Sequence, residues 1–205
     1  GHPLTLGAAP TVTTGVVSAL ERRLDVGGET MNSGVTLFGL IQTDAPITRG
    51  SSGGALINNN GELIGITTAI ATADVGAEGL GFAVPVNLAL GIADDLLNDG
   101  QILHAFLGIL GAQHFDTADD GARVFSGVFI QELYGPGNDV FAIGKAGAMP
   151  GDIIKKINGI NVKTLDSLIT VLRQKRAGDT VEIEILRNSQ FITLVFELDL
   201  RPSDV

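Results

Sequence analysis

Two adjacent serines, Ser51 and Ser52, lie among glycines in the segment RGSSGG, residues 49–54. A serine nucleophile needs an accessible hydroxyl, a base that takes its proton, and backbone N–H groups that meet the developing oxyanion. The glycines allow a tight turn that exposes the hydroxyl and directs the N–H groups of Gly50 and Ser52 to one point. The segment therefore meets two of the three requirements for serine catalysis and leaves the base to be found.

Residues 50–54 also match the pattern G-x-S-x-G, the nucleophile elbow of α/β hydrolases. In that fold a helix follows the serine at once. Here the segment ALINNNGELIGI follows, which predicts two strands joined by an Asn-Gly turn. The context disfavours a complete α/β hydrolase and favours a serine on a loop of a β-structure. A glycine-serine turn without any chemistry is the remaining alternative.

The first half of the chain consists of short β-branched runs separated by glycine-containing turns, which predicts a sandwich or barrel. The predicted strands cover residues 11–20, 35–44, 54–70 and 79–85. Residues 85–100 then carry apolar side chains at helical spacing and end in Asn-Asp-Gly, which predicts a helix. We place a domain boundary there and predict domains over residues 1–100 and 101–205.

The second half mixes strands with helix. Residues 151–162 predict two strands around an Asn158-Gly159 turn. Residues 164–178 predict a helix with Thr164 as N-cap, an apolar face, and Gly178 after its end. Residues 179–198 predict a last hairpin, because apolar residues alternate with acidic ones.

Composition excludes several classes of function. The net charge is −10 and both halves are acidic, which argues against nucleic acid and anionic membrane surfaces as partners. The absence of cysteine excludes disulfides, thiol catalysis and thiolate metal sites. His2, His104 and His114 are too far apart for a zinc site, so we expect no metal and no cofactor. No apolar run predicts a membrane span, and the first residues do not predict a targeting signal.

A longer stretch around the serines, QTDAPITRGSSGGALINNNGELIGITTAI, resembles the nucleophile region of the HtrA/Deg family of trypsin-like serine proteases. GHPLTLGAAPTVTTGVVSAL resembles the strand and turn that enter the second barrel in that family. GLGFAVPVNLA resembles the last strand of that barrel and its closing helix. The resemblance covers residues 1 to about 100. It implies a mainly β fold, the second β-barrel of a two-barrel protease with a closing helix and without the first barrel.

Carried over by position, the resemblance implies that Ser52 is the nucleophile and that the N–H groups of Gly50 and Ser52 form the oxyanion hole. It also implies a segment that pairs with substrate backbone and edges a pocket for a small apolar side chain: Ile66, Thr67, Thr68 and Ala69. Two positions depart from the family pattern, since Ser51 replaces the usual Asn and Arg49-Gly50 replaces Pro-Gly. Neither change removes a group that does chemistry.

The family places its catalytic histidine and aspartate upstream of the serine. Only 51 residues precede Ser52, and His2 lies in the turn segment that leads into the second barrel. Asp25 and Asp44 match no catalytic-aspartate segment. We therefore expect the histidine and aspartate of the triad to lie outside this chain, and the chain alone to be catalytically incomplete.

Residues 101–205 resemble the PDZ domain that follows the protease in this family, through FLGI (106–109), KAGAMPGDIIKKINGINV (145–162), the helix 164–177 and the last hairpin. The resemblance implies a small β-barrel or sandwich with helices. Such a domain binds a peptide as an added strand and holds its terminal carboxylate on backbone N–H groups. The implied carboxylate loop is Phe106, Leu107, Gly108 and Ile109, and the implied groove residues are Leu168 and Leu172. The alternative is that these residues are an ordinary strand and a core helix.

Together these resemblances imply an HtrA/Deg-type serine endopeptidase that degrades unfolded or damaged proteins. Its expected partners are unfolded polypeptides, peptide C-termini at the PDZ groove and copies of itself, as a trimer by family. Its expected location is the cell envelope or periplasm. The alternative function is a non-catalytic peptide-binding or scaffold protein built from a half-barrel and a PDZ domain.

Overall fold

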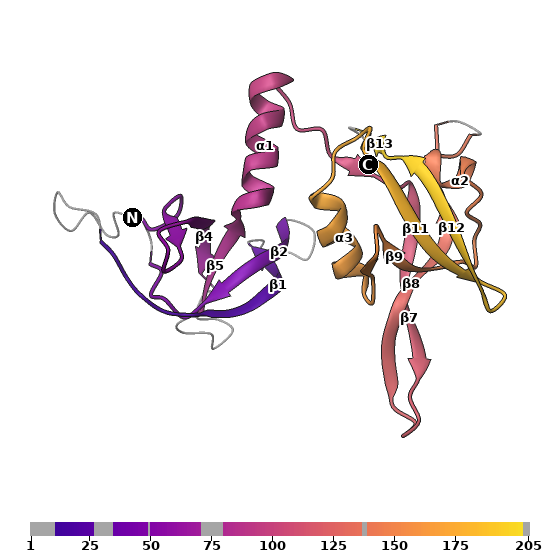
Figure 1. Ribbon diagram of the computed structural model, residues 1–205, viewed down its shortest axis with the longest axis horizontal. Coiled ribbons are helices and arrows are strands. Elements are labelled where there is room, and N and C mark those ends of the chain that lie inside the picture. The colour runs from indigo at the N-terminus through magenta and orange to yellow at the C-terminus, as the bar shows by residue number, and fades with distance from the viewer. Residues whose placement is uncertain (1–10, 27–34, 49, 71–79, 137–138, 203–205) are drawn as a thin grey trace. The chain divides into compact units, whose positions relative to one another are not determined.

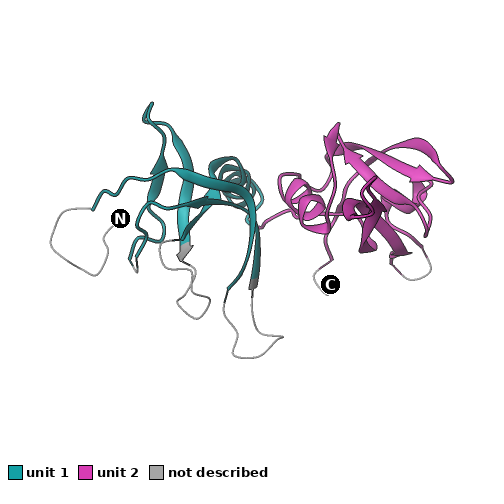
Figure 2. Ribbon diagram, turned by 90° about the horizontal axis from the view of Figure 1, so that it is seen from below, with its two compact units in different colours: residues 1–100 teal, residues 101–205 magenta. Residues whose placement is uncertain are grey.

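The computed structural model describes residues 11–26, 35–48, 50–70, 80–136 and 139–202. The chain divides into two compact units, residues 1–100 and residues 101–205 (Figure 2). Both units are mainly β, as the sequence predicts (Figure 1). Within the described ranges, no helix has the length and apolar character needed to cross a membrane.

Unit 1 is an antiparallel sheet with strand order β1-β2-β5-β4-β3, followed by helix α1. The elements are β1 (Val17–Val26), β2 (Val35–Thr43), β3 (Ala55–Ile57), β4 (Leu63–Ile70), β5 (Gly81–Pro85) and α1 (Val86–Asn98). The predicted turn between β3 and β4 forms because Asn58 Oδ1 accepts hydrogen bonds from the N–H groups of Asn60 and Glu62. Gly61 takes the positive φ of +79° that this turn requires.

The sheet of unit 1 is open, which corrects the expectation of a β-barrel. In the described part of unit 1, no pairing joins the two outer strands, β1 and β3. The strand predicted from residue 11 begins only at Val17. The residues before it contact the 44–46 segment through single hydrogen bonds, from Thr13 Oγ1 to Pro46 O (3.1 Å) and from Val16 N to Asp44 Oδ1 (2.7 Å). Isolated bonds of this kind do not make the ladder on which a barrel would close.

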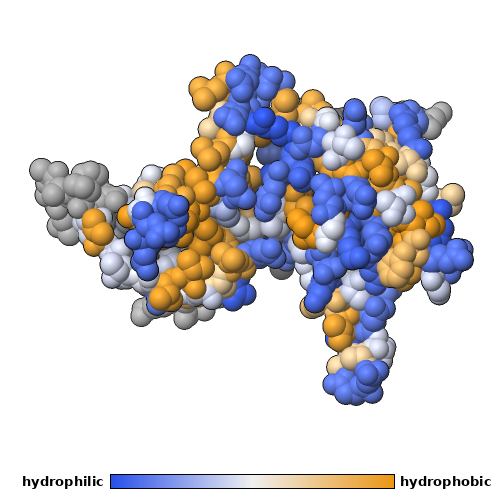
Figure 3. All heavy atoms as spheres, viewed as in Figure 1, coloured by the Kyte–Doolittle hydropathy of each residue, from blue (hydrophilic) through white to orange (hydrophobic). Residues whose placement is uncertain are grey.

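The core of unit 1 is small. Leu40 and Ala83 are almost fully buried between β2 and β5, which pair in the middle of the sheet. The outer strand β1 buries little, and Leu20 on it is 65% exposed. Figure 3 accordingly shows apolar atoms gathered over the surface of unit 1.

Unit 2 is built on one sheet with strand order β12-β11-β9-β8-β7, with β10 paired to β9 and a separate two-stranded sheet of β6 and β13. Its strands are β6 (Ala105–Phe106), β7 (Ile109–Thr117), β8 (Arg123–Leu133), β9 (Ile153–Ile157), β10 (Ile160–Asn161), β11 (Thr180–Arg187), β12 (Gln190–Glu197) and β13 (Asp199–Leu200). Its helices are α2 (Ala142–Lys145) and α3 (Leu165–Arg173).

Unit 2 has a continuous apolar core, to which the sheet and both helices contribute. The alternation predicted for β11 directs Ile183 and Ile185 into this core, where both are fully buried. One buried carboxylate, Asp152, accepts two hydrogen bonds from Arg187, at 2.6 and 2.7 Å. Arg187 also donates to Gly147 O at 2.7 Å, so this pair joins the turn before β9 to the end of β11.

Helix α3 begins as predicted and ends earlier. Thr164 Oγ1 accepts from Ser167 N and Ser167 Oγ accepts from Thr164 N, both at 3.0 Å, which makes a capping box. The helix was expected to continue to residue 177 but ends at Arg173. Beyond it, Arg176 N donates to Asp179 Oδ2 and Ala177 N donates to Leu103 O. One local bond and one tertiary bond thus replace the helical ones.

Strands β7 and β8 form a hairpin that extends beyond the rest of the sheet (Figure 1). The two strands pair as far as Thr117 and Arg123, whereas β8 pairs with β9 only at Val128 and Phe129. We call the projecting part, residues 113–127, the arm. Gly121, with a φ of +81°, closes its turn.

Candidate functional site

The Ser52 loop consists of two successive turns between β2 and β3. Ser51 N donates to Thr48 O at 2.9 Å, and Gly54 N donates to Ser51 O at 3.0 Å. Gly50 and Gly53 have φ angles of +89° and +81°, which residues other than glycine adopt only with strain. The glycines therefore let the chain reverse twice within a few residues and leave Ser52 exposed at the surface.

Thr67 on β4 holds this loop in place. Its hydroxyl donates to Ser51 O and accepts from Gly54 N, the latter at 3.1 Å. Its backbone accepts from Gly53 N at 2.7 Å and donates to Gly54 O at 2.9 Å. Thr67 is 8% exposed, so these bonds form largely away from water and fix the loop against the strand.

The Ser52 hydroxyl donates to Thr68 O at 3.1 Å, which brings the predicted nucleophile next to the predicted substrate segment. Ile66 has strand neighbours on both edges, Ala55 on β3 and Val84 on β5. Strand β3 pairs no further along, so Thr68 and Ala69 extend past it with β5 on one side only. The backbone of Thr67 bonds to Gly53 and Gly54 of the loop, so Thr68 and Ala69 are the part of the segment whose second edge pairs with no described strand.

A cavity of about 990 Å³ lies beside the loop and was not predicted from the sequence. Threonines and aliphatic residues line it, among them Val16, Ile47, Ser51, Leu56 and Thr67. Among the described residues that line it, none is acidic, basic or a histidine. These described residues therefore offer shape and apolar contact beside the loop and no catalytic base.

The two described aspartates that precede Ser52 bond to other groups. Asp44 accepts from Val16 N, and Asp25 accepts from the Thr36 hydroxyl and from Arg23. The Thr36 hydrogen bond is the main cause that lowers the pKa of Asp25, an exposed carboxylate on β1. His2 lies outside the described residues. The two other histidines belong to unit 2, so the described part of unit 1 brings no base to Ser52.

In unit 2, the predicted carboxylate loop lies between β6 and β7. Gly108 has a φ of +71°, and a Cβ there would meet the Phe141 ring at 2.3 Å, so only glycine fits. Phe106 packs edge-to-face on the same ring at a centroid distance of 5.1 Å. Leu107 is buried in the core. The loop is therefore fixed by packing beneath it, and Ile109 follows as the first residue of β7.

The predicted groove wall is α3. Leu168 is 2% exposed and lies within the apolar core, and Leu172 is partly buried against it. Leu165 at the start of the helix lies over Gly111 of β7, since a Cβ on Gly111 would be 3.4 Å from Leu165 Cδ1. The structure thus brings α3 and β7 side by side, with β7 as the outer strand of the sheet.

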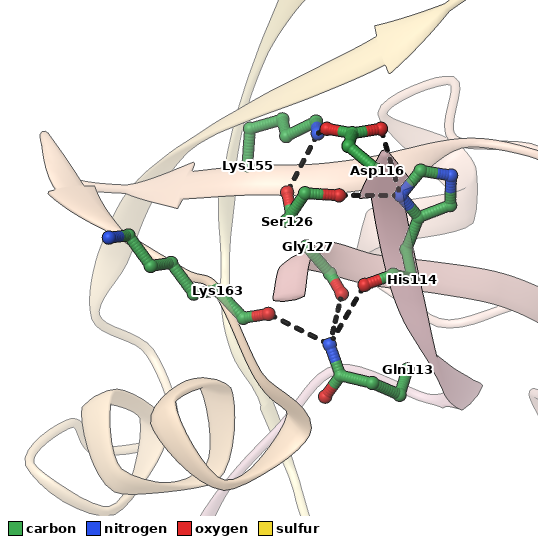
Figure 4. Close-up of polar contacts among 7 residues, drawn as sticks. All are labelled: Gln113, His114, Asp116, Ser126, Gly127, Lys155 and Lys163. Carbon is green, nitrogen blue, oxygen red and sulfur yellow. Dashed lines mark hydrogen bonds and ion pairs between the residues drawn. The ribbon is translucent and has the colours of Figure 1, made fainter. Parts of the chain in front are cut away.

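A polar network at the base of the arm was missed at the sequence level (Figure 4). It joins His114 and Asp116 on β7 to Ser126 on β8 and Lys155 on β9, and beside them Gln113 on β7 to Gly127 on β8. The Asp-Asp-Gly turn at 119–121 predicts a hairpin at this point, but nothing in the sequence indicates which polar side chains meet. In the described residues, no cluster of three or more histidines and carboxylates is placed to hold a metal ion.

Two family models match the chain, the trypsin-like peptidase domain over residues 1–66 and the PDZ domain over residues 113–198. The chain is 39% identical to the periplasmic pH-dependent serine endoprotease DegQ of Escherichia coli over 99% of its length. It is 40% identical to the serine protease PepD of Mycobacterium tuberculosis over 89% of its length. The chain thus combines a fragment of a trypsin-like peptidase domain with a PDZ domain, and its homologues are HtrA/Deg proteases.

Solved structures of HtrA-type proteases agree with this assignment. One of AlgW with a tripeptide has a TM-score of 0.64 and 32% identity, and covers 98% of this chain and 64% of that one. The serine endoprotease from Yersinia pestis has a TM-score of 0.54 and 30% identity, covering 98% and 60%. The chain spans 42% of DegQ and 38% of PepD, about two fifths of the curated HtrA/Deg relatives.

Proposed function

We propose that residues 1–100 supply the nucleophile-bearing half of an HtrA/Deg-type serine endopeptidase, and that residues 101–205 supply a PDZ domain that binds peptide C-termini. In this proposal Ser52 attacks the scissile carbonyl, and the N–H groups of Gly50 and Ser52 bind the oxyanion. The observation that carries the proposal is the exposed Ser52 hydroxyl, 3.1 Å from Thr68 O at the point where β4 passes the end of β3.

The proposed reaction is acyl transfer to serine followed by hydrolysis. Ser52 Oγ bonds to the carbonyl carbon, and its proton passes to a histidine base from outside these 205 residues and then to the leaving amine. Water then releases the acyl group from Ser52. Substrate would lie along Ile66, Thr67, Thr68 and Ala69. Strand addition needs an extended chain, so unfolded polypeptides fit this site.

The test compares the two adjacent serines in the full-length gene product. Ser52→Ala is expected to lower kcat for unfolded casein by about 10⁴- to 10⁶-fold. Ser51→Ala is the matched control and is expected to retain most of the activity. The 205-residue chain alone is expected to show no serine-dependent cleavage. Activity that survives Ser52→Ala would point to a different nucleophile, and no cleavage by the unaltered full-length product would support the alternative, a non-catalytic peptide-binding or scaffold protein.

For unit 2, we propose that a peptide adds as a strand to β7 while N–H groups of Phe106, Leu107, Gly108 and Ile109 hold its terminal carboxylate. An apolar last side chain would lie against α3 near Leu168 and Leu172. The support is the glycine-dependent loop at the start of an outer strand, beside a helix. The AlgW structures were solved with bound peptides.

Peptide binding is tested with matched free-acid and amidated peptides that end in an apolar residue. The free acid is expected to bind with a dissociation constant on the order of micromolar, since a few strand hydrogen bonds and one buried side chain must offset the ordering of the peptide. Amidation removes the charge that the loop would hold. Equal affinity for the two forms would contradict the proposed carboxylate loop.

Location and assembly follow the relatives in this proposal. Several relatives, DegQ and DegP among them, are named as periplasmic enzymes. We propose an extracytoplasmic location for this protein and a homo-oligomer, a trimer by family, in its full-length form. Sedimentation of the full-length product would test the trimer.

A further inference from the structure

The free edge of β7 continues well past the proposed carboxylate loop. Gly108 O accepts from Tyr134 N next to β8. Because backbone polar groups alternate along a strand, the odd-numbered residues from Ile109 to Thr117 direct theirs away from β8. No strand in the described part of unit 2 pairs with that edge. A peptide that pairs with Ile109 can therefore continue along the arm.

The arm is tied to the helix side of the sheet through Gln113 (Figure 4). Gln113 Nε2 donates to Lys163 O at 2.8 Å and to Gly127 O at 3.0 Å. Gln113 Oε1 accepts from the N–H of Leu165, the first residue of α3, at 3.2 Å. One side chain thus joins both strands of the arm to the start of the proposed groove wall.

The opposite face of the arm is tied to β9. Lys155 Nζ donates to Ser126 O at 2.7 Å and lies 3.5 Å from Asp116 Oδ2. His114 Nδ1 lies 2.8 Å from Ser126 Oγ and 3.8 Å from Asp116 Oδ1. A two-stranded ribbon alone is marginally stable in water. Contacts on both faces hold the arm extended before a ligand binds, which lowers the entropy cost of binding.

Beyond these contacts the arm presents an aromatic pair. Phe115 and Phe125 lie opposite each other, with ring centroids 5.0 Å apart, and the Arg123 guanidinium lies 4.2 Å from the Phe115 centroid. Phe125 is 50% exposed and Val124 is 48% exposed. Figure 3 shows apolar atoms part-way along the arm and a hydrophilic end. Phe115 is two residues from Gln113, so it lies on the same face, the face of α3.

We propose that the arm recognises the upstream part of the peptide whose C-terminus the 106–109 loop holds, and that Phe115 and Phe125 select an apolar or aromatic residue six positions before the last. This rests on the proposed groove. Phe115 follows Ile109 by six positions. Paired antiparallel strands advance residue for residue, and directly opposite residues share a face. The ligand class is an extended polypeptide of at least seven residues.

The experiment titrates the 205-residue chain with three free-acid peptides that share the same last four residues. One has only those four residues, one has ten residues with Phe six before the last, and one has ten with Ser there. The Phe peptide is expected to bind about 1.5- to 5-fold more tightly than the other two, the range of a cross-strand aromatic contact. The substitution in the peptide tests the contact without altering the protein.

Phe125→Ala is expected to bind the Phe and Ser peptides equally. Phe191→Ala is the matched control, because Phe191 is 64% exposed on β12, the opposite outer strand of the same sheet, and this variant should keep the difference. Equal affinity of the unaltered chain for the two long peptides, with the short one bound, would overturn the role of the arm and leave the groove standing. No binding of any peptide would overturn both. Self-association that Phe125→Ala abolishes, without any peptide preference, would assign the arm to a contact between copies.

Discussion

Unit 1 and unit 2 bury their apolar side chains to different degrees. In unit 2, Ile130, Ile154 and Ile183 are fully buried in a cluster that the sheet shares with α2 and α3. In unit 1, the buried apolar side chains lie mainly on β2 and β5 in the middle of the sheet, and Leu20 and Ile57 on its two outer strands are 65% and 58% exposed.

The difference follows from what each sheet packs against. The sheet of unit 2 packs on its own helices and makes a core that is closed within the unit. The open sheet of unit 1 has outer strands whose apolar side chains no other described element of that unit covers. Domains need two packed layers around one core, and exposed apolar patches of this kind mark an interaction surface. We infer that unit 2 folds by itself and that unit 1 depends on a second layer.

The largest expected effect contrasts one core position with one surface position. Ile154→Ala in unit 2 should lower the free energy of unfolding of that unit by about 2–5 kcal/mol, because it removes a fully buried side chain and leaves a cavity. Leu20→Ala in unit 1 should change stability by less than about 0.5 kcal/mol. Tyr134, the single tyrosine and located in unit 2, reports on that unit by fluorescence, while circular dichroism follows both. Equal losses in the free energy of unfolding for the two variants would contradict the difference between the units.

A smaller loss of stability is expected from a substitution of Thr67, which fixes the Ser52 loop of unit 1. Thr67→Val removes the hydroxyl that bonds Ser51 O and Gly54 N, and should destabilise unit 1 by about 1–3 kcal/mol, since partly buried polar groups lose their partner. Thr67→Ser keeps the hydroxyl and serves as control. Thermal unfolding measures the change, and Tyr134 fluorescence should not respond. A valine variant as stable as the wild type would mean that Thr67 does not fix the loop.

The smallest expected effect is on the pH dependence of unit 2. The Ser126 hydroxyl, followed by Lys155, holds the pKa of Asp116 below the 3.8 of an ordinary aspartate. A lowered pKa in the folded state contributes stability above the unfolded pKa, and this is lost as the pH falls through the folded pKa. Asp116→Asn should therefore flatten the loss of stability between about pH 5 and pH 2, and Ser126→Ala should flatten it in part. Unfolding profiles unchanged in both variants would contradict this role.

Local signals in the sequence were sufficient where the structure depends on neighbours in the chain. The turn at Asn158-Gly159 and the N-cap at Thr164 were predicted, because both rest on the backbone preferences of a few residues. The end of α3 was wrong, since Asp179 and Leu103 compete for N–H groups beyond Arg173. Barrel closure was also wrong, because it depends on a pairing between distant strands that no local pattern fixes.

For the candidate sites, the sequence predicted Ser52 on a glycine-containing loop, and the structure brings its hydroxyl to 3.1 Å from Thr68 O. The chemical roles of these residues stay predictions. The hold of Thr67 on the loop and the two-sided attachment of the arm were not predicted. Both rest on side chains such as Gln113 that meet partners up to 52 positions away in the chain. The alternation of apolar residues and the turn signals in the sequence give no information on such long-range side-chain contacts.

The pairing of β6 with β13 has a consequence for the order of events during synthesis. It joins Ala105 and Phe106 to Leu200 and Asp199, so the loop that begins at Phe106 is supported by a strand that is made much later than the loop itself. At about 5–20 residues per second, the roughly 90 residues between them take on the order of 5 to 20 s to translate. A nascent chain would pass that time with the loop unsupported. It could not capture a peptide terminus until translation had passed residue 200, so synthesis and binding would be separated in time.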